Sequence, residues 1–423
     1  MKKNTPKPFV SPEENIIDCP LDEIVKKGAQ RMLRQALEVE VDSFVERHQY
    51  VMDDKARRLV VRNGYNKPRK IVTGAGQIEV RAPRVDDRIL DKLNEPRFKS
   101  GIVPRYLRRT KNINELIPVL YLKGISTGDF TEALQVLLGK DVVGLSAENI
   151  VRLKQIWQKE YEEWNNRDLS NTKYVYWWVD GVYFNVRLDD DRQCILIIIG
   201  AREDGTKEIV AIEDGFRESK ESWQSLLRRL KRRGLKTGPK LAVGDGALGF
   251  WAAVREEYLD TKEQRCWVHK TSNVLDKMPK SLQSKAKSML HDIYLAPTKK
   301  DADNAFDIFI EEFDLKYPKA VDCLRKDRDE LMAFYDYPAE HWIHLRTTNP
   351  IESTFATVRL RTKKTKGSGS RIATFTMVFK LLLSAKKRWK RLRGYNKIED
   401  VLNGVTFKDG EMVTSETTET VEA

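Results

Sequence analysis

Two aspartates stand where stretches of apolar residues end, and they are the first candidates for chemistry in the sequence. Asp180 lies in YVYWWVDGVYF and Asp245 in LAVGDGALGF. A single Asp-Gly pair is typical of a turn. If the two apolar stretches are neighbouring strands, however, the carboxylates meet at one sheet edge and repel each other unless a divalent cation bridges them. Magnesium or manganese suits such oxygen ligands, since no His and Cys cluster of zinc-type spacing surrounds these aspartates.

Glu352 is the third candidate acid. It is the only acid between Arg346 and Tyr395, a segment that holds seven arginines and seven lysines. Pro350 is favoured in the first turn of a helix, so we place Glu352 near a helix start, with Arg359 two turns later on the same face. The alternative is an exposed glutamate that interacts only with the helix dipole.

Three converging carboxylates predict two-metal chemistry on a phosphodiester. Two Mg²⁺ or Mn²⁺ ions about 4 Å apart can activate a water or a sugar hydroxyl and stabilise the leaving oxygen. No protein nucleophile is then needed, and the sequence has neither a G-x-S-x-G elbow nor a Walker phosphate loop. We therefore expect Asp180, Asp245 and Glu352 to be both catalytic and metal-binding, with no nucleotide cofactor.

The distribution of charge predicts a polyanionic partner. The excess of +13 in the basic segment 346–395 equals that of the whole 423-residue chain. An exposed, solvated basic face is the alternative, but a fifty-residue segment with a single acid favours nucleic acid. We expect double-stranded DNA to contact six of its side chains: Arg359, Arg361, Lys363, Lys364, Lys366 and Arg371.

Composition limits the class of protein. With 40% hydrophobic and 33% charged residues, the chain is expected to be globular and not membrane-integral. The first twenty residues lack the apolar stretch of a signal peptide or anchor. The four cysteines show no Cys-x-x-Cys spacing, which favours a reducing compartment. We expect a cytoplasmic, nucleoid-associated protein that does not contact the membrane.

Periodicity indicates which elements position these residues. Residues 21–48 have the pattern of an amphipathic helix, and RKIVTGAGQIEVRAPRV that of a β-hairpin. Three short helices over 113–165 are compatible with a helix-turn-helix DNA reader. From Tyr174, three β-rich runs and then alternating helices and strands, including QRCWVH as a strand, predict an α/β fold with a mixed sheet flanked by helices.

The motifs resemble those of the bacterial, Mutator-like family of insertion-sequence transposases. The stretches that carry the resemblance are WWVDGVYFNVR, LAVGDGALGFWAAV, RCWVHKTSNVLDKMPK and LRTTNPIESTFATVRLRTKKTKG, and the similarity extends over roughly residues 21–410. It implies a ribonuclease H-like fold with an Asp-Asp-Glu triad at Asp180, Asp245 and Glu352. Arg359 then corresponds to the family's basic residue seven positions after its Glu.

The resemblance also implies that Cys266 and His269 form the family's Cys-x-x-His signature. Two ligands are too few for a structural zinc site, so we interpret this pair as packing residues or as neighbours of the metal ligands. A helical insertion domain is implied between the second Asp and the Glu, and the helical periodicity of 280–344 agrees with it.

The expected function is binding of an element's terminal inverted repeats, followed by strand cleavage and strand transfer into target DNA. The resemblance implies a homodimer acting in a synaptic complex. The alternatives are a structure-specific nuclease of the same fold without strand transfer, and a catalytically silent DNA-binding repressor.

The expected domain organisation has seven parts. They are a flexible N-terminus (1–20), a helix and β-hairpin module (21–110), a helix-turn-helix-like DNA-binding region (111–168), the first part of the catalytic core (169–279), the helical insertion domain (280–345), the second part of the core with the basic C-terminal helices (346–410), and a disordered tail (411–423).

Overall fold

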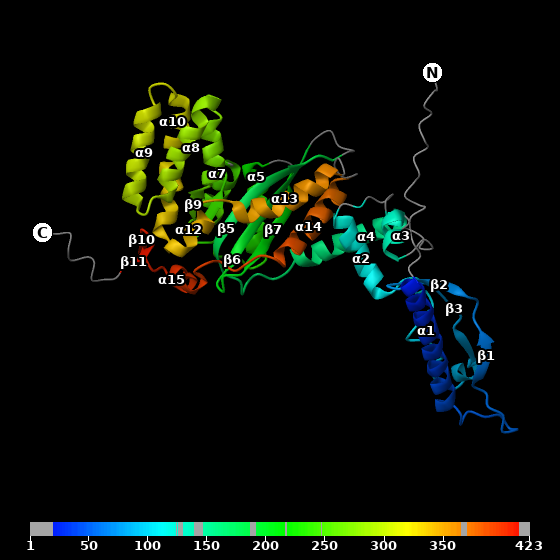
Figure 1. Ribbon diagram of the computed structural model, residues 1–423. Coiled ribbons are helices and arrows are strands. Elements are labelled where there is room, and N and C mark those ends of the chain that lie inside the picture. The colour runs from blue at the N-terminus through cyan, green and yellow to red at the C-terminus, as the bar shows by residue number, and fades with distance from the viewer. Residues whose placement is uncertain are drawn as a thin grey trace, which may run out of the picture. The chain divides into compact units, whose positions relative to one another are not determined.

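The computed structural model describes residues 20–123, 125, 130–138, 147–186, 192–215, 218–246, 248–364 and 370–413. The chain divides into two compact units, residues 1–151 and 152–423 (Figure 1). Each unit has hydrophobic clusters of its own. Among the described helices, none combines the length and the apolar character needed to cross a bilayer.

A long helix packed against small antiparallel sheets forms the first unit. Its elements are α1 (Pro20–Arg47), β1 (Val61–Tyr65), β2 (Arg69–Thr73), β3 (Gly76–Val80), β4 (Pro83–Asp86), η2 (Arg88–Asp91), α2 (Lys111–Lys123) and α3 (Phe130–Leu138). The predicted hairpin is β2 and β3, and Gly76 after the turn has a left-handed φ of +92°. Leu37 of α1 packs with Ile71 and Ile78 of this hairpin. The pairing of β1 with β4 was not predicted.

Helices α2 and α3 lie where the sequence predicts the first two of three short helices, and the third is α4 (Ala147–Asn165). The helix-turn-helix interpretation of this region stays a prediction.

A five-stranded mixed sheet is the centre of the second unit. Its strands and the helices between them are β5 (Tyr174–Phe184), β6 (Gln193–Arg202), β7 (Lys207–Gly215), α5 (Lys220–Arg232), β8 (Leu241–Gly244), α6 (Leu248–Glu257), β9 (Lys262–Arg265) and α7 (Trp267–Leu275). The strand order is β7-β6-β5-β8-β9. β5, β6 and β7 are antiparallel, whereas β8 pairs parallel with β5 and β9. The predicted α/β class with a mixed sheet is confirmed, and the first and fourth strands are neighbours in it.

Helices cover both faces of the sheet. Trp177 of β5 packs in one hydrophobic cluster with Trp223 of α5 and Phe250 of α6. Two further helices, α13 (Asn349–Lys364) and α14 (Arg371–Lys386), lie across the sheet in Figure 1. Phe184 of β5 contacts the ring of Phe355 in α13. Because side chains alternate along a strand, the even-numbered positions of β5, position 180 included, point toward α13.

The range 280–345 is helical throughout, with turns between its helices. Its elements are α8 (Lys280–Leu295), α9 (Lys299–Phe313), α10 (Pro318–Arg325), α11 (Arg328–Met332), η3 (Ala333–Asp336), η4 (Ala339–His341) and α12 (Trp342–Leu345). After α14 come η5 (Tyr395–Lys397), α15 (Ile398–Leu402), β10 (Phe407–Lys408) and β11 (Glu411–Met412). The expected tail therefore begins with residues that pair with β10.

One strand prediction is wrong. We expected QRCWVH to be a strand, but β9 ends at Arg265, Cys266 is the N-cap residue of α7, and His269 lies in that helix. The backbone turns here because the N–H of Trp267 donates to Arg346 O (2.9 Å) and its indole Nε1 donates to Leu331 O (2.9 Å). These long-range bonds are absent from a local sequence pattern.

Candidate active site

The sheet brings Asp180 and Asp245 to corresponding positions on adjacent parallel strands. Trp178 of β5 pairs with Val243 of β8, and each aspartate lies two residues beyond its member of that pair. We expected Asp180 at a strand end, but β5 continues beyond it to Phe184, paired with β6. The end of β8 at Gly244 leaves that side of β5 open beside Asp180.

The charges of the other two predicted acids act on the carboxyl of Asp180. The pKa of Asp180 is raised to about 6, first by burial and then by the charge of Asp245; the charge of Glu352 also acts to raise it, whereas His269 and Arg359 act to lower it. All four of these groups therefore act on the Asp180 carboxyl. Closely spaced acids in a partly buried site repel one another, which favours either protonation or a bound cation.

Glu352 is held in the first turn of α13. Its backbone N–H donates to Thr348 O (3.1 Å), and the buried Thr348 hydroxyl donates to its Oε1 (3.0 Å). The Nδ1 atom of His269 lies 3.7 Å from the same Oε1. Pro350 in this turn gives up no helical hydrogen bond, since the first-turn N–H groups have no partner within the helix. Thr348 and His269 thus contact the Glu352 carboxylate near the start of α13.

Cys266 and His269 connect this helix start to the end of β9. The thiol sulfur accepts a hydrogen bond from the N–H of Thr348 and lies beside the Thr348 hydroxyl oxygen, both at 3.3 Å. A hydrogen bond with Cys266 raises the pKa of His269 to about 9. Burial acts to raise the pKa of Cys266, but the hydrogen bonds from His269 and Thr348 bring it below its usual value.

Donor atoms of Cys266, His269 and Glu352 all lie within 4.8 Å of one another. They are three potential ligands, one fewer than a structural zinc site requires. The bonds to the thiol sulfur and to Glu352 favour the interpretation that this pair supports the triad glutamate.

Sequence reasoning missed one acid at this site. Glu218 precedes α5, and its Oε1 is buried with no hydrogen-bond donor among the described residues. Burial and then the charges of Asp245 and Asp180 raise its pKa to about 8. A Cβ atom at Gly181 would lie 2.6 Å from its Cδ, so Glu218 approaches β5 from the face opposite the Asp180 side chain.

In each Asp-Gly pair, a side chain at the glycine position would clash with a neighbouring residue. Gly181 leaves space for the carboxyl of Glu218. Gly246 leaves space for the guanidinium of Arg265, because a Cβ atom there would lie closer than a van der Waals contact to Nη2. That guanidinium donates to the carbonyl of Asp245 and so holds the backbone of the second aspartate. These glycines were the signal in the sequence that could have indicated a crowded site.

The predicted DNA contacts differ in how far the structure describes them. Arg359 is exposed on α13, and its charge reaches Asp180. Arg371 donates from Nη2 to Asp214 Oδ1 (2.9 Å), so a phosphate would compete with this ion pair. The side chains of Arg361, Lys363 and Lys364, and all of Lys366, lie outside the described part of the chain.

Comparison with known proteins places the chain among transposases. Residues 7–392 match the family described as "Transposase, Mutator family". The chain is 53% identical over 301 residues to the transposase for insertion sequence element IS6120 of Mycolicibacterium smegmatis, an alignment that covers 71% of this chain and 93% of that protein. It is 49% identical over 286 residues to the transposase for IST2 of Acidithiobacillus ferrooxidans, covering 66% and 94%.

Proposed function

The chain belongs to the Mutator family of transposases, and from this premise we propose that it is an Asp-Asp-Glu transposase. It binds the terminal inverted repeats of an insertion sequence and catalyses metal-dependent strand cleavage and strand transfer. The observation that carries the proposal is the action of Asp245 and Glu352 on the buried carboxyl of Asp180. These three acids are far apart in the chain.

The donor set fits Mg²⁺ or Mn²⁺. The triad offers carboxylate oxygens, the ligands that these hard cations prefer. Burial and the charge of Asp245 disfavour the ionised form of Asp180, and a bound cation would favour it. Asp180, Asp245 and Glu352 would hold two ions, which when bound supply an activated water or 3′-hydroxyl and stabilise the leaving oxygen.

The remaining residues of the site act by position and charge. His269 and Thr348 keep Glu352 oriented before any ion binds. Arg265 fixes the backbone at Asp245 through its carbonyl. Arg359, exposed on the helix that carries Glu352, is placed to hold a phosphate of the substrate strand.

The strand order supports a ribonuclease H-like core. Three antiparallel strands followed by two parallel ones place the first aspartate on the central strand and the second just after its parallel neighbour. We infer that residues 280–345 are an insertion domain in this core. DNA recognition by residues 21–168 and phosphate contacts from the basic segment complete the proposed division of labour, within a homodimer that brings two ends together.

The test uses the full chain and DNA carrying the sequences that flank its coding region. Wild-type protein with Mg²⁺ should nick the element end and join a pre-cleaved end to target DNA. Asp245→Asn should abolish both reactions and leave end binding within about twofold. The exposed Asp260, changed to Asn, is the matched control and should keep full activity.

Cleavage that survives in Asp245→Asn would contradict the assignment of the triad. Wild-type hydrolysis without joined product would identify a nuclease, and end binding without either reaction would identify a repressor.

A further inference from the structure

Helix α1 carries a second apolar stripe besides the one that packs on the hairpin. The stripe follows alternating steps of four and three residues, the spacing of a coiled-coil seam. Its members are Leu21, Val25, Gly28, Met32, Gln35 and Val39. Within the first unit Leu21, Met32 and Val39 are 64%, 67% and 59% exposed. Exposed apolar surface of this extent on a helix indicates an interaction site.

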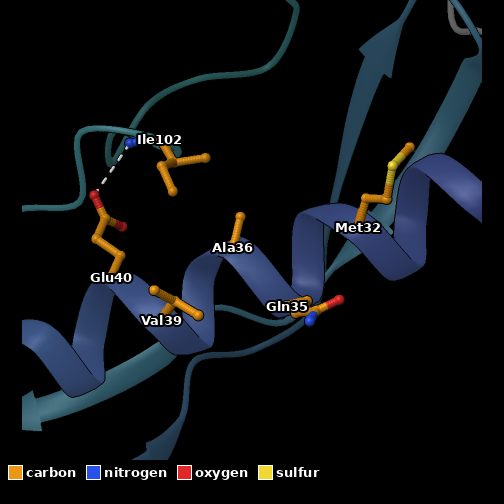
Figure 2. A pocket seen from close by; sticks show the side chains of 6 residues that line it. All are labelled: Met32, Gln35, Ala36, Val39, Glu40 and Ile102. Atoms are coloured by element: carbon orange, nitrogen blue, oxygen red, sulfur yellow. Dashed lines mark hydrogen bonds between the residues drawn. The ribbon is translucent and has the colours of Figure 1, made fainter.

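The middle of the seam borders a hollow. Met32, Gln35, Ala36, Val39, Glu40 and Ile102 line it, and Figure 2 shows Ile102 above the small side chain of Ala36. Glu40 fixes this wall, since its Oε1 accepts from the N–H groups of Gly101 (2.7 Å) and Ile102 (3.3 Å). The hollow is therefore anchored by hydrogen bonds, and a large apolar side chain of a partner can enter it.

We propose that the 32–39 part of this seam binds the same part of a second copy of the chain, in antiparallel orientation about a two-fold axis between Gln35 and Ala36. This axis places Met32 of one copy opposite Val39 of the other, because both are equally far from it along the helix. A Cβ atom added at Gly28 would have no other atom within 4 Å, so the backbones can approach closely there. An isologous contact of this kind closes as a dimer.

The charges beside the seam select the second copy and the antiparallel orientation. Asp22 at one end of α1 faces position 49 of the partner, two residues from Arg47 at the other end of the partner helix and on the same flank of the seam. On the other flank Arg31 faces position 40 of the partner helix, between Glu38 and Asp42 of that helix. These two acids share Arg62 within their own unit, which leaves one negative charge uncompensated.

Nucleic acid is a poor fit as the occupant. The six seam residues carry no charge, whereas DNA-binding surfaces are rich in Lys and Arg. The proposal deepens the homodimer of the proposed function by naming its contact surface. Its test contains neither DNA nor metal, so its failure leaves the assignment of the triad untouched.

The experiment measures the mass of the full chain by sedimentation equilibrium in EDTA. The wild type should be a dimer. Met32→Glu combined with Val39→Glu should weaken dimerisation about 100-fold or more, because two apolar side chains lose their burial against the partner. Val119→Glu, at a residue of the same unit that is 50% exposed on α2, is the control and should not change the mass.

Charge exchange tests the orientation. Asp22→Arg and Arg47→Glu should each weaken the dimer, and the double exchange should restore it. A monomeric wild type, an unchanged dimer in the seam variant, or no rescue by the double exchange would each overturn the proposal. A seam variant that loses DNA binding or thermal stability while remaining dimeric would assign the seam to DNA or to another part of the chain, and would overturn it as well.

Discussion

Replacing Asp180 by Asn should stabilise the metal-free protein, although it removes a residue of the proposed triad. The pKa of Asp180 is about 6 in the folded chain, against 3.8 for an ordinary aspartate. Between these values the folded state binds more protons than the unfolded state, so stability falls as the pH rises. One pKa unit corresponds to about 1.4 kcal/mol, and the ionised carboxyl therefore costs up to about 3 kcal/mol of unfolding free energy above pH 7.

The size of the effect should depend on pH. With the two pKa values above, the gain in Asp180→Asn is about 1.6 kcal/mol at pH 5 and about 3 kcal/mol at pH 8. Urea unfolding followed by tryptophan fluorescence measures it selectively, since all nine tryptophans lie between residues 157 and 389, in the second unit. Asp260→Asn, at an exposed position of the same unit, should show no such pH-dependent gain.

Metal should reverse the order of stability. Mn²⁺ at 1,000 times its dissociation constant adds about 4.1 kcal/mol to a protein that binds it only when folded, which exceeds the advantage of about 3 kcal/mol that Asp180→Asn has at pH 8. The wild type should gain this amount, and Asp180→Asn should gain little. If the variant is less stable than the wild type at pH 8 in EDTA, or if Mn²⁺ stabilises both proteins equally, the inference of mutually repelling metal-binding acids is wrong.

Two further predictions concern the surroundings of the triad. Gly181→Ala should displace the Glu218 carboxyl, which a Cβ atom would approach to 2.6 Å, and lower the Mn²⁺ affinity measured by calorimetry; an unchanged affinity would show that Glu218 has no part in the site. Neutralising Lys363, Lys364 and Lys366 together should weaken DNA binding for every sequence and reduce the slope of log affinity against log salt by up to about 3, because phosphate contacts are not sequence-specific. Loss of preference for the element ends in a competition assay would instead mean that the basic segment reads sequence.

The sequence was sufficient to predict the structure where a local pattern is compatible with only one kind of element. The amphipathic period of residues 21–48 and the Gly-Ala turn of the hairpin correspond to α1 and to β2 with β3. Each Asp-Gly pair follows an apolar run, and the two runs are the adjacent strands β5 and β8. Both patterns depend on residues close together in the chain.

The sequence was insufficient where contacts between residues far apart in the chain determine the local structure. Cys266, Trp267 and Val268 read equally well as a buried strand or as the start of a buried helix, and bonds to Arg346 and Leu331 select the helix.

Glu218 follows Asp180 by 38 residues and stands in no motif. Only the packing of its carboxyl over Gly181 reveals it. The space that a glycine leaves cannot be assigned to a neighbour until the fold is known.

The long stretch between the second and third acids has a consequence for the order in which the protein is made. Glu352 follows Asp245 by 107 residues, and α8 to α12 lie between them. A growing polypeptide that has just left the ribosome up to α12 already contains both aspartates and the five strands of the sheet, but not the third carboxylate. Under the proposed assignment, premature termination anywhere before α13 yields fragments that lack one of the three metal-binding carboxylates.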